Sequence, residues 1–434
     1  MNQLLSTCGD YFAVALKDRV YCVCIASESM SELLQLSKKS DKDQEQESAE
    51  SSKRKSEEHN QQKLVEELKD ILAVAVTTTN GSVWCAVSRR EKTLAIYKLN
   101  ENNSEPAIQP YLVYNTPKRV GSLCFSSLER KEGELSSGTT QHSVPILIAG
   151  DLAGDAFAYS LTEKRRRLLL GHTASMLTGV AVVRNHILTA DRDEKIRISS
   201  FPDSFVIEGF LLGHTAYVTS MDAVSKDGGN TGSLVATCGG DKTLRLWNLD
   251  EMKQAAEVDT NTNEVGSEEQ IPTEVAINED GSRIAVIFDR SKRLDIYEVR
   301  NEDETKTRLS LVQSIEASSQ PLAIAFSNKD TLFTLLQEPD FLVAYTTAAQ
   351  TDSSAVAIQR VEAIEKLNQE ATKNKIIMPE TILEKDTWGN IKLKKLNETR
   401  GPAAPDAPWN RVERIEIAKQ RNKRHKKRKL EKRS

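Results

Sequence analysis

Short stretches of alternating apolar and polar residues recur along the chain, and most of them end in an aromatic side chain. Alternation with a period of two is typical of β-strands. From Tyr159 onward the ends of these stretches lie 40, 48, 50 and 48 residues apart. The seven stretches of this kind are Arg19–Tyr21, Lys92–Tyr97, Ala156–Tyr159, Ile196–Ser199, Leu244–Trp247, Arg293–Tyr297 and Phe341–Tyr345. Seven repeats of four short strands predict an all-β, seven-bladed β-propeller over residues 1–350.

Two polar segments interrupt this pattern, and a different pattern follows it. Residues 27–69 and 128–143 contain too few apolar side chains to offset the entropy of ordering, so we expect disordered insertions there. Residues 351–400 are predicted to form a helical or irregular extension, because Val361, Ile364 and Leu367 have helical spacing. Whether that helix packs on the propeller is left open. Residues 401–434 are predicted to form a linker and a disordered basic tail.

Two Gly-His pairs, Gly171-His172 and Gly213-His214, lie 42 residues apart, and each precedes an aspartate six residues before the end of a closing strand. Such a period with these signals is typical of a WD-repeat blade. Buried polar groups need partners, so we expect a hydrogen-bonded set in each blade rather than catalysis. The residues expected in these structural sets are His172, Thr189 and Asp193 in the first copy, and His214, Thr237, Asp241 and Trp247 in the second.

The net charge of −4 conceals a strong asymmetry. Residues 411–434 carry a net charge of +9, so the remaining 410 residues carry −13. The basic run is interpreted as a nuclear import signal, with a solvated tail and nonspecific RNA contact as alternatives. We therefore expect the protein in the nucleus and leave its presence in the cytoplasm open. The residues assigned to import are Lys423, Arg424, Lys426, Lys427, Arg428 and Lys429.

The motifs searched for do not indicate an enzyme. The sequence has no glycine-rich nucleotide loop, no HExxH motif and no nucleophile elbow. Its six cysteines form no CxxC pair, which argues against a zinc site, and no apolar run is long enough to span a bilayer. Neither a secretory signal nor a cofactor is expected.

The segment Leu188–Ser199 (LTADRDEKIRIS) departs from an ordinary WD repeat, which prefers small residues in place of Asp191 and Arg192. Together with Ala149–Asp155 and the two Gly-His segments, it closely resembles the WD-repeat, non-catalytic subunit of the eukaryotic tRNA (guanine-N7) methyltransferase, the family called wuho in insects. The resemblance implies a scaffold that docks and stabilises a separate catalytic subunit, which itself binds S-adenosylmethionine. It also implies that the scaffold helps to hold tRNA while a guanine of the variable loop is methylated.

By position, Asp193, Glu194, Lys195 and Arg197 match the docking segment of that family. Lys195 and Arg197 are two residues apart on a predicted strand, so their side chains share one face, and we expect both at the surface. The alternative is a nuclear interaction hub, either a ribosome-assembly propeller or the substrate receptor of a ubiquitin ligase. The best match to a ligase-adaptor box is Trp247–Asp250 (WNLD), which lacks the usual charges.

Overall fold

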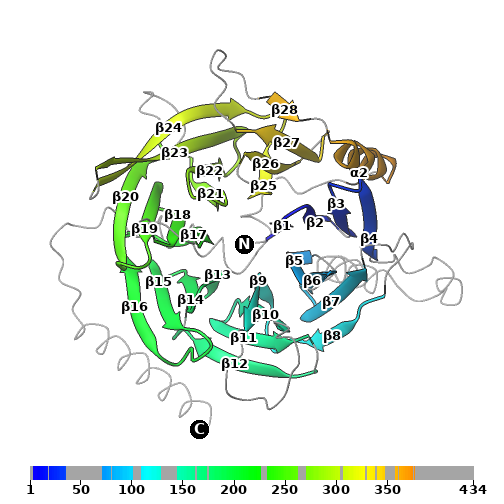
Figure 1. The fold of residues 1–434 in the computed structure, drawn as a ribbon, viewed down its shortest axis with the longest axis horizontal. Coiled ribbons are helices and arrows are strands. Elements are labelled where there is room, and N and C mark those ends of the chain that lie inside the picture. Colours follow the sequence, from blue (N-terminus) through cyan, green and yellow to red (C-terminus); the bar gives the residue numbers. More distant parts are fainter. Residues whose placement is uncertain are drawn as a thin grey trace, which may run out of the picture. The chain divides into compact units, whose positions relative to one another are not determined.

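Seven four-stranded antiparallel sheets follow one another around a ring, with the first strand of each nearest the centre (Figure 1). The computed structural model describes residues 3–35, 71–100, 109–128 and 144–376. Short gaps remain at 18, 80, 162–163, 174, 226–231, 262–269, 304–305, 328–329, 338–339, 348–356, 360 and 375. All described elements belong to one compact unit, Met1–Lys385, whereas the second unit, Asp386–Ser434, lies outside the described residues.

Each blade uses four strands that are consecutive in the chain. Blades 1 to 3 are β1 (Leu5–Cys8), β2 (Tyr11–Leu16), β3 (Arg19–Cys24) and β4 (Ser29–Gln35); β5 (Ile71–Thr79), β6 (Ser82–Arg89), β7 (Thr93–Asn100) and β8 (Leu112–Asn115); and β9 (Val120–Leu128), β10 (Val144–Asp151), β11 (Asp155–Ser160) and β12 (Arg166–Gly171). Blades 4 and 5 are β13 (Leu177–Val183), β14 (His186–Asp191), β15 (Lys195–Ser200) and β16 (Ile207–Leu212); and β17 (Val218–Val224), β18 (Leu234–Gly239), β19 (Thr243–Asn248) and β20 (Lys253–Asp259). Blades 6 and 7 are β21 (Pro272–Ile277), β22 (Arg283–Phe288), β23 (Arg293–Asp303) and β24 (Lys306–Glu316); and β25 (Pro321–Phe326), β26 (Thr331–Leu336), β27 (Leu342–Thr346) and β28 (Ala357–Gln359).

The predicted seven-bladed propeller is confirmed. The seven predicted stretches, six of which end in an aromatic residue, become the third strands of the seven sheets, from β3 to β27. Because the middle strands are apolar on both faces, each blade packs against both neighbours, and a separate buried cluster fills the space between most adjacent pairs. Burial of this apolar surface is the main force that holds the blades together.

The ring closes between blades 7 and 1 without a strand shared by both sheets. The hydroxyl of Thr7 donates to the carbonyl of Phe326 at 2.5 Å, and one buried cluster joins blades 7, 1 and 2. Helix α2 (Glu362–Lys373) contacts β27 and β4, and buries Ile364 and Leu367. The helix that the sequence left unplaced therefore packs across the closing point, beside β3 and β4 in Figure 1.

Three predicted boundaries are wrong. Leu128, expected to begin the second insertion, is the last residue of β9 and pairs with Val144. The insertion expected to begin at residue 27 begins later, because Ser29–Gln35 pairs with β3 as the outer strand of blade 1. The propeller does not end at residue 350, since Ala357–Gln359 pairs with β27 and completes blade 7. Residues 36–70, 129–143 and 377–434 lie outside the described residues, and so do the import residues Lys423–Lys429.

Candidate functional site

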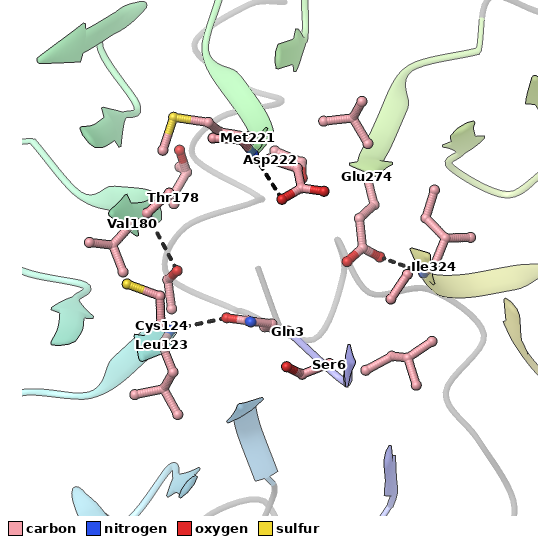
Figure 2. Close-up of a pocket in the computed structure, with 18 of the residues that line it drawn as sticks. Gln3, Ser6, Leu123, Cys124, Thr178, Val180, Met221, Asp222, Glu274 and Ile324 are labelled. Atoms are coloured by element: carbon pink, nitrogen blue, oxygen red, sulfur yellow. Dashed lines mark hydrogen bonds between the residues drawn. The ribbon is translucent and has the colours of Figure 1, made fainter. Parts of the chain in front are cut away.

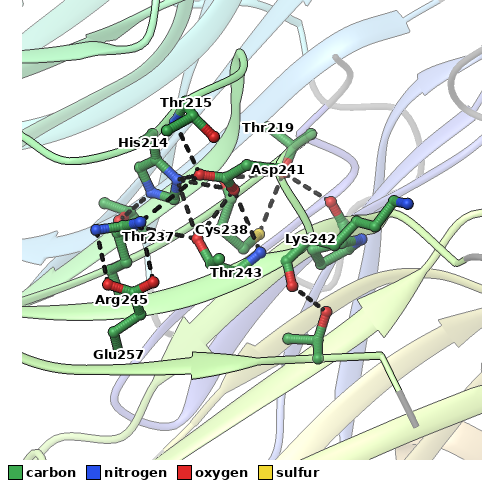
Figure 3. A network of polar contacts seen from close by, with 12 residues as sticks. His214, Thr215, Thr219, Thr237, Cys238, Asp241, Lys242, Thr243, Arg245 and Glu257 are labelled. Carbon is green, nitrogen blue, oxygen red and sulfur yellow. Dashed lines mark hydrogen bonds and ion pairs between the residues drawn. The ribbon is translucent and has the colours of Figure 1, made fainter. Parts of the chain in front are cut away.

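Blade 5 contains a chain of buried hydrogen bonds, and Figure 3 shows the part around His214, Thr237 and Asp241. His214 Nδ1 lies 3.0 Å from Asp241 Oδ2, and His214 Nε2 lies 2.8 Å from Thr237 Oγ1. Trp247 Nε1 donates to the same Thr237 hydroxyl at 2.8 Å. The chain ties the loop before β17 to the middle strands β18 and β19, so its role is structural.

The Asp241 carboxylate is the charged centre of this network. Burial alone would raise its pKa, but hydrogen bonds from His214, Thr215 and Thr243, together with the charge of His214, hold the pKa below its ordinary value. Arg245, which is buried, ion-pairs through Nη1 with Glu257 at 2.9 Å. Blade 5 therefore satisfies its charged groups from within the chain.

Blade 4 builds the corresponding network with a different aspartate. His172 Nδ1 lies 2.9 Å from Asp191 Oδ2, and His172 Nε2 lies 2.8 Å from Thr189 Oγ1. The sequence prediction that Asp193 serves this histidine is wrong. Asp193 has an exposed side chain, and its carboxylate lies 3.9 Å from Arg192 Nε.

Asp191 replaces Asp193 because it also organises the turn between β14 and β15. Its Oδ1 accepts the backbone N–H groups of Asp193 at 2.8 Å and Lys195 at 3.2 Å. Asp151 makes the same pair of contacts after β10, to Ala153 and Asp155. An aspartate at the end of a second strand was therefore a readable signal, and it occurs twice in the sequence.

The four residues of the expected docking segment lie together on this turn and on β15, but they are not equally accessible. Asp193 and Lys195 are exposed, whereas Glu194 is half-buried and has a positive φ of 75°. Within the described part of the chain, the Lys195 ammonium has no hydrogen-bond or ion-pair partner. An exposed cation next to an exposed carboxylate can contact a partner molecule without disturbing the blade.

Arg197 differs from the expectation of a surface residue. Its guanidinium donates to Ser199 Oγ at 2.8 Å and to the carbonyls of Gly171 and Ser204 at 3.3 Å each. Because Gly171 belongs to blade 3, Arg197 links two blades. Burial lowers the pKa of the half-buried guanidinium below its ordinary value. Charge reversal at Arg197 is therefore expected to destabilise the propeller as well as any complex.

With this geometry in place, comparison with known proteins assigns the family. The family model described as the tRNA methyltransferase TRM82 WD40 domain matches residues 149–369 of the chain. The chain belongs to this family. The matched region includes the whole of blades 4 and 5, and with them both hydrogen-bond networks and the residues Asp193–Arg197.

Relatives of the TRM82-type domain carry consistent names. The chain is 30% identical over 193 residues to "tRNA (guanine-N(7)-)-methyltransferase non-catalytic subunit wuho" of Aedes aegypti, which covers 43% of this chain and 44% of that protein. It is 28% identical over 249 residues to the non-catalytic subunit wdr4 of Dictyostelium discoideum, over 50% of this chain and 52% of that protein. The chain thus matches about half the length of these relatives.

Among solved structures, a chain of "Crystal Structure of Mitotic Checkpoint Complex" matches with a TM-score of 0.55 and 17% identity, over 80% of this chain and 91% of that one. This likeness concerns the fold alone.

The inner strands of the propeller surround a cavity of about 290 Å³ (Figure 2). Several polar side chains reach from one blade to the backbone of the next. Asp222 Oδ2 accepts the Ile277 N–H at 2.9 Å, and Glu274 Oε2 accepts the Ile324 N–H at 3.2 Å. Burial raises the pKa of Asp222 to about 6, and burial together with the charge of Asp222 raises that of Glu274 to about 8. No motif in the sequence indicated that these carboxylates link blades 5, 6 and 7.

Other classes of site find no support in the described residues. They contain no group of three or more side chains arranged to hold a metal ion. None of the helices seen in the structure has the length and apolar character needed to cross a membrane.

Proposed function

We propose that this chain is the non-catalytic subunit of a tRNA (guanine-N7) methyltransferase, and that it docks and stabilises a separate catalytic subunit. Membership of the TRM82 WD40 family carries the proposal, because relatives that share the domain are named as this subunit. The chain would also help to hold tRNA while the variable-loop guanine is methylated at N7.

In this proposal the catalytic subunit docks on the turn and strand formed by Asp193, Glu194, Lys195 and Arg197. The observation that supports this placement is the exposed Lys195 ammonium, which meets no ion-pair partner among the residues that the structure describes. A carboxylate of the catalytic subunit would supply one. Opposite charges across an interface contribute to specificity and to the rate of association.

The methyl donor is proposed to bind the catalytic subunit and not this chain. The support is the sequence, which lacks the glycine-rich loop that binds such nucleotides at a strand-to-helix turn. Isothermal titration of S-adenosylmethionine into the isolated chain should therefore release no saturable heat. Saturable binding to this chain alone would contradict the assignment of roles.

The decisive experiment measures complex formation with the catalytic methyltransferase subunit and the N7-methylguanosine content of tRNA made by the pair. Lys195→Glu is expected to weaken the complex by about 10- to 100-fold, since like charges would then meet at the interface. Its melting temperature should equal that of the unaltered chain, because the side chain is exposed.

Lys253→Glu is the matched control, an exposed lysine at the start of the outer strand of blade 5. It should leave both binding and melting unchanged. If the unaltered chain captures a set of pre-ribosomal or ubiquitin-ligase proteins and no methyltransferase subunit, the proposed function fails in favour of an interaction hub. If binding occurs but Lys195→Glu binds normally, only the docking segment is misplaced.

A further inference from the structure

The outer strand of blade 4 and the turn before it expose an unusual concentration of large apolar side chains. Among the residues described by the structure, ten large hydrophobic side chains are exposed, and five of them lie within eight consecutive positions. We call this group the apolar strip: Phe205, Val206, Ile207, Phe210 and Leu212, with exposed fractions of 78%, 44%, 48%, 43% and 64%. A contiguous exposed apolar patch of this kind marks an interaction site more often than chance exposure.

Three residues of the strip, Ile207, Phe210 and Leu212, lie on a free sheet edge, and Phe205 and Val206 lie in the turn that precedes it. Strand β16 is the last strand of its sheet and sits at the outer perimeter of the ring (Figure 1). Proteins usually protect such edges with charged side chains, because an apolar edge invites association. The corresponding edge of blade 5, β20, follows that rule with the sequence KQAAEVD. Strand β16, with the sequence IEGFLL, does not.

The neighbouring strand β15 carries two positively charged side chains beside the apolar strip. In the register of β15 and β16, Arg197 pairs with Phe210 and Lys195 with Leu212. At the equivalent place in blade 5, Arg245 pairs with Glu257 and forms an ion pair with it. Blade 4 thus has an aromatic ring where blade 5 has the carboxylate.

The single acidic side chain of β16 does not replace that carboxylate. Glu208 accepts a hydrogen bond from Ser200 and lies 2.8 Å from His186 Nε2. Across the described chain, no carboxylate pairs with Arg197 or Lys195. Two cations therefore lie beside the apolar strip: Lys195 meets no partner among the described residues, and Arg197 donates to hydroxyl and carbonyl oxygens but meets no carboxylate.

We infer that the apolar strip is a second part of the docking surface, and that it receives an apolar ridge of the catalytic methyltransferase subunit flanked by carboxylates. The carboxylates would meet Lys195 and Arg197, while the ridge covers Phe205, Phe210 and Leu212. This inference rests on the proposed function, because it names the same partner. The occupant fits both features of the surface, which a purely acidic or purely apolar partner would not.

The test compares two double variants of the full-length chain. Phe205→Ser with Phe210→Ser removes the two aromatic side chains of the strip. Leu311→Ser with Val312→Ser is the control, because these residues of β24 are exposed to 48% and 47% on the outer strand of blade 6. Affinity for the catalytic subunit is measured by surface binding, and self-association by sedimentation.

The strip variant is expected to bind the catalytic subunit about 100-fold more weakly, as loss of two aromatic anchors at an interface typically does. The control should bind within about 3-fold of the unaltered chain. Unchanged melting temperatures show that both variants fold. If the melting temperature of the strip variant falls, Phe205→Ser alone, at the most exposed position, repeats the test.

The possible failures are distinguishable. If the unaltered chain does not bind the methyltransferase subunit, the proposed function itself fails. If it binds, and the strip variant binds equally well, the strip is not part of the interface and the inference is overturned. If the strip variant abolishes only self-association of the isolated chain, the occupant is a second copy, which also overturns the inference.

Discussion

Blades 4 and 5 start from the same plan. Each has a histidine before its first strand and a threonine in its second strand, at 2.8 Å from Nε2 of that histidine. Each also has a non-glycine residue with positive φ in the turn before its third strand, Glu194 at 75° and Lys242 at 64°. The difference between the blades therefore lies in what surrounds a shared frame.

That difference is a difference in how polar groups are satisfied. Blade 5 places Trp247 against its threonine and Glu257 against its arginine, so its network is closed within the chain. Blade 4 has Ser199 in place of the tryptophan and Phe210 in place of the glutamate. Blade 5 is thus built as a structural unit. Blade 4 lacks the equivalents of the Trp247 and Glu257 contacts and exposes a surface that another molecule can use.

The largest expected effect is on stability. It should differ between the two blades at one equivalent position, Trp247 in blade 5 and Ser199 in blade 4. Trp247→Ala removes a fully buried indole and its hydrogen bond to Thr237, which should destabilise the propeller by about 3–5 kcal/mol. Ser199→Ala at the equivalent place removes one hydroxyl and should cost about 1 kcal/mol. Urea unfolding followed by fluorescence and circular dichroism measures both. Equal losses would show that blade 4 is as dependent on this position as blade 5.

The second prediction concerns the two aspartates of blade 4. Asp191→Ala removes the carboxylate from His172 and from two backbone N–H groups, and should cost about 1–3 kcal/mol. Asp193→Ala removes an exposed side chain and should cost less than about 0.5 kcal/mol. Thermal melting distinguishes the two variants. A larger loss at Asp193 would restore the assignment made from sequence spacing.

The sequence was sufficient for the fold because the fold depends on repetition. Aromatic-ending strands such as Leu244–Trp247 recur at a blade-sized period, and burial on both faces makes each of them apolar. The outer strands were harder to find. Ser29–Gln35 carries several polar residues (SMSELLQ), so its sequence resembles that of the polar segment that follows it.

The site was only partly predictable, because the sequence does not show which way each side chain points. Spacing aligned Asp193 with Asp241, but which carboxylate turns toward the histidine depends on the turn that Asp191 holds. Sequence could not show that Arg197 bonds to the carbonyl of Gly171, because that contact joins two blades. Nor could it show which face of the apolar run Phe205–Leu212 meets solvent.

The third prediction uses the inner strands, where blade 5 carries Asp222 and blade 4 carries Ala181 at the equivalent register. Burial raises the pKa of Asp222 to about 6, against about 3.9 for an unfolded aspartate. The folded state therefore binds more protons between these values, so stability should fall as pH rises from about 4 to 6. The effect is on the order of 1 kcal/mol, because the Asp222 side chain is only partly buried and the interaction is discounted accordingly.

Asp222→Asn keeps an oxygen to accept the Ile277 N–H and removes the titration, so its melting temperature should fall less across this pH range. Asp203→Asn, an exposed position in the loop before β16, is the control and should retain the full pH dependence. If Asp222→Asn also retains the full pH dependence, another group is responsible. Glu274→Gln is then the next variant to measure, because titration of Glu274 should extend the pH dependence of stability up to about pH 8.

The smallest expected effect tests whether the shared turn has acquired a second role in blade 4. Glu194→Gly and Lys242→Gly both relieve the strain of a positive φ, whereas glycine also adds conformational freedom to the unfolded chain. Because these two effects oppose each other, each variant should change stability by less than about 1 kcal/mol, and both in the same direction. The two variants should differ in binding, because Glu194 lies in the proposed docking segment and Lys242 lies in blade 5, whose polar network is satisfied within the chain. We expect only Glu194→Gly to change the affinity for the catalytic subunit, by about 3- to 10-fold, as for a contact at the rim of an interface. Equal affinity of the two glycine variants would mean that the turn is structural in both blades, and that docking relies on Lys195, Arg197 and the apolar strip.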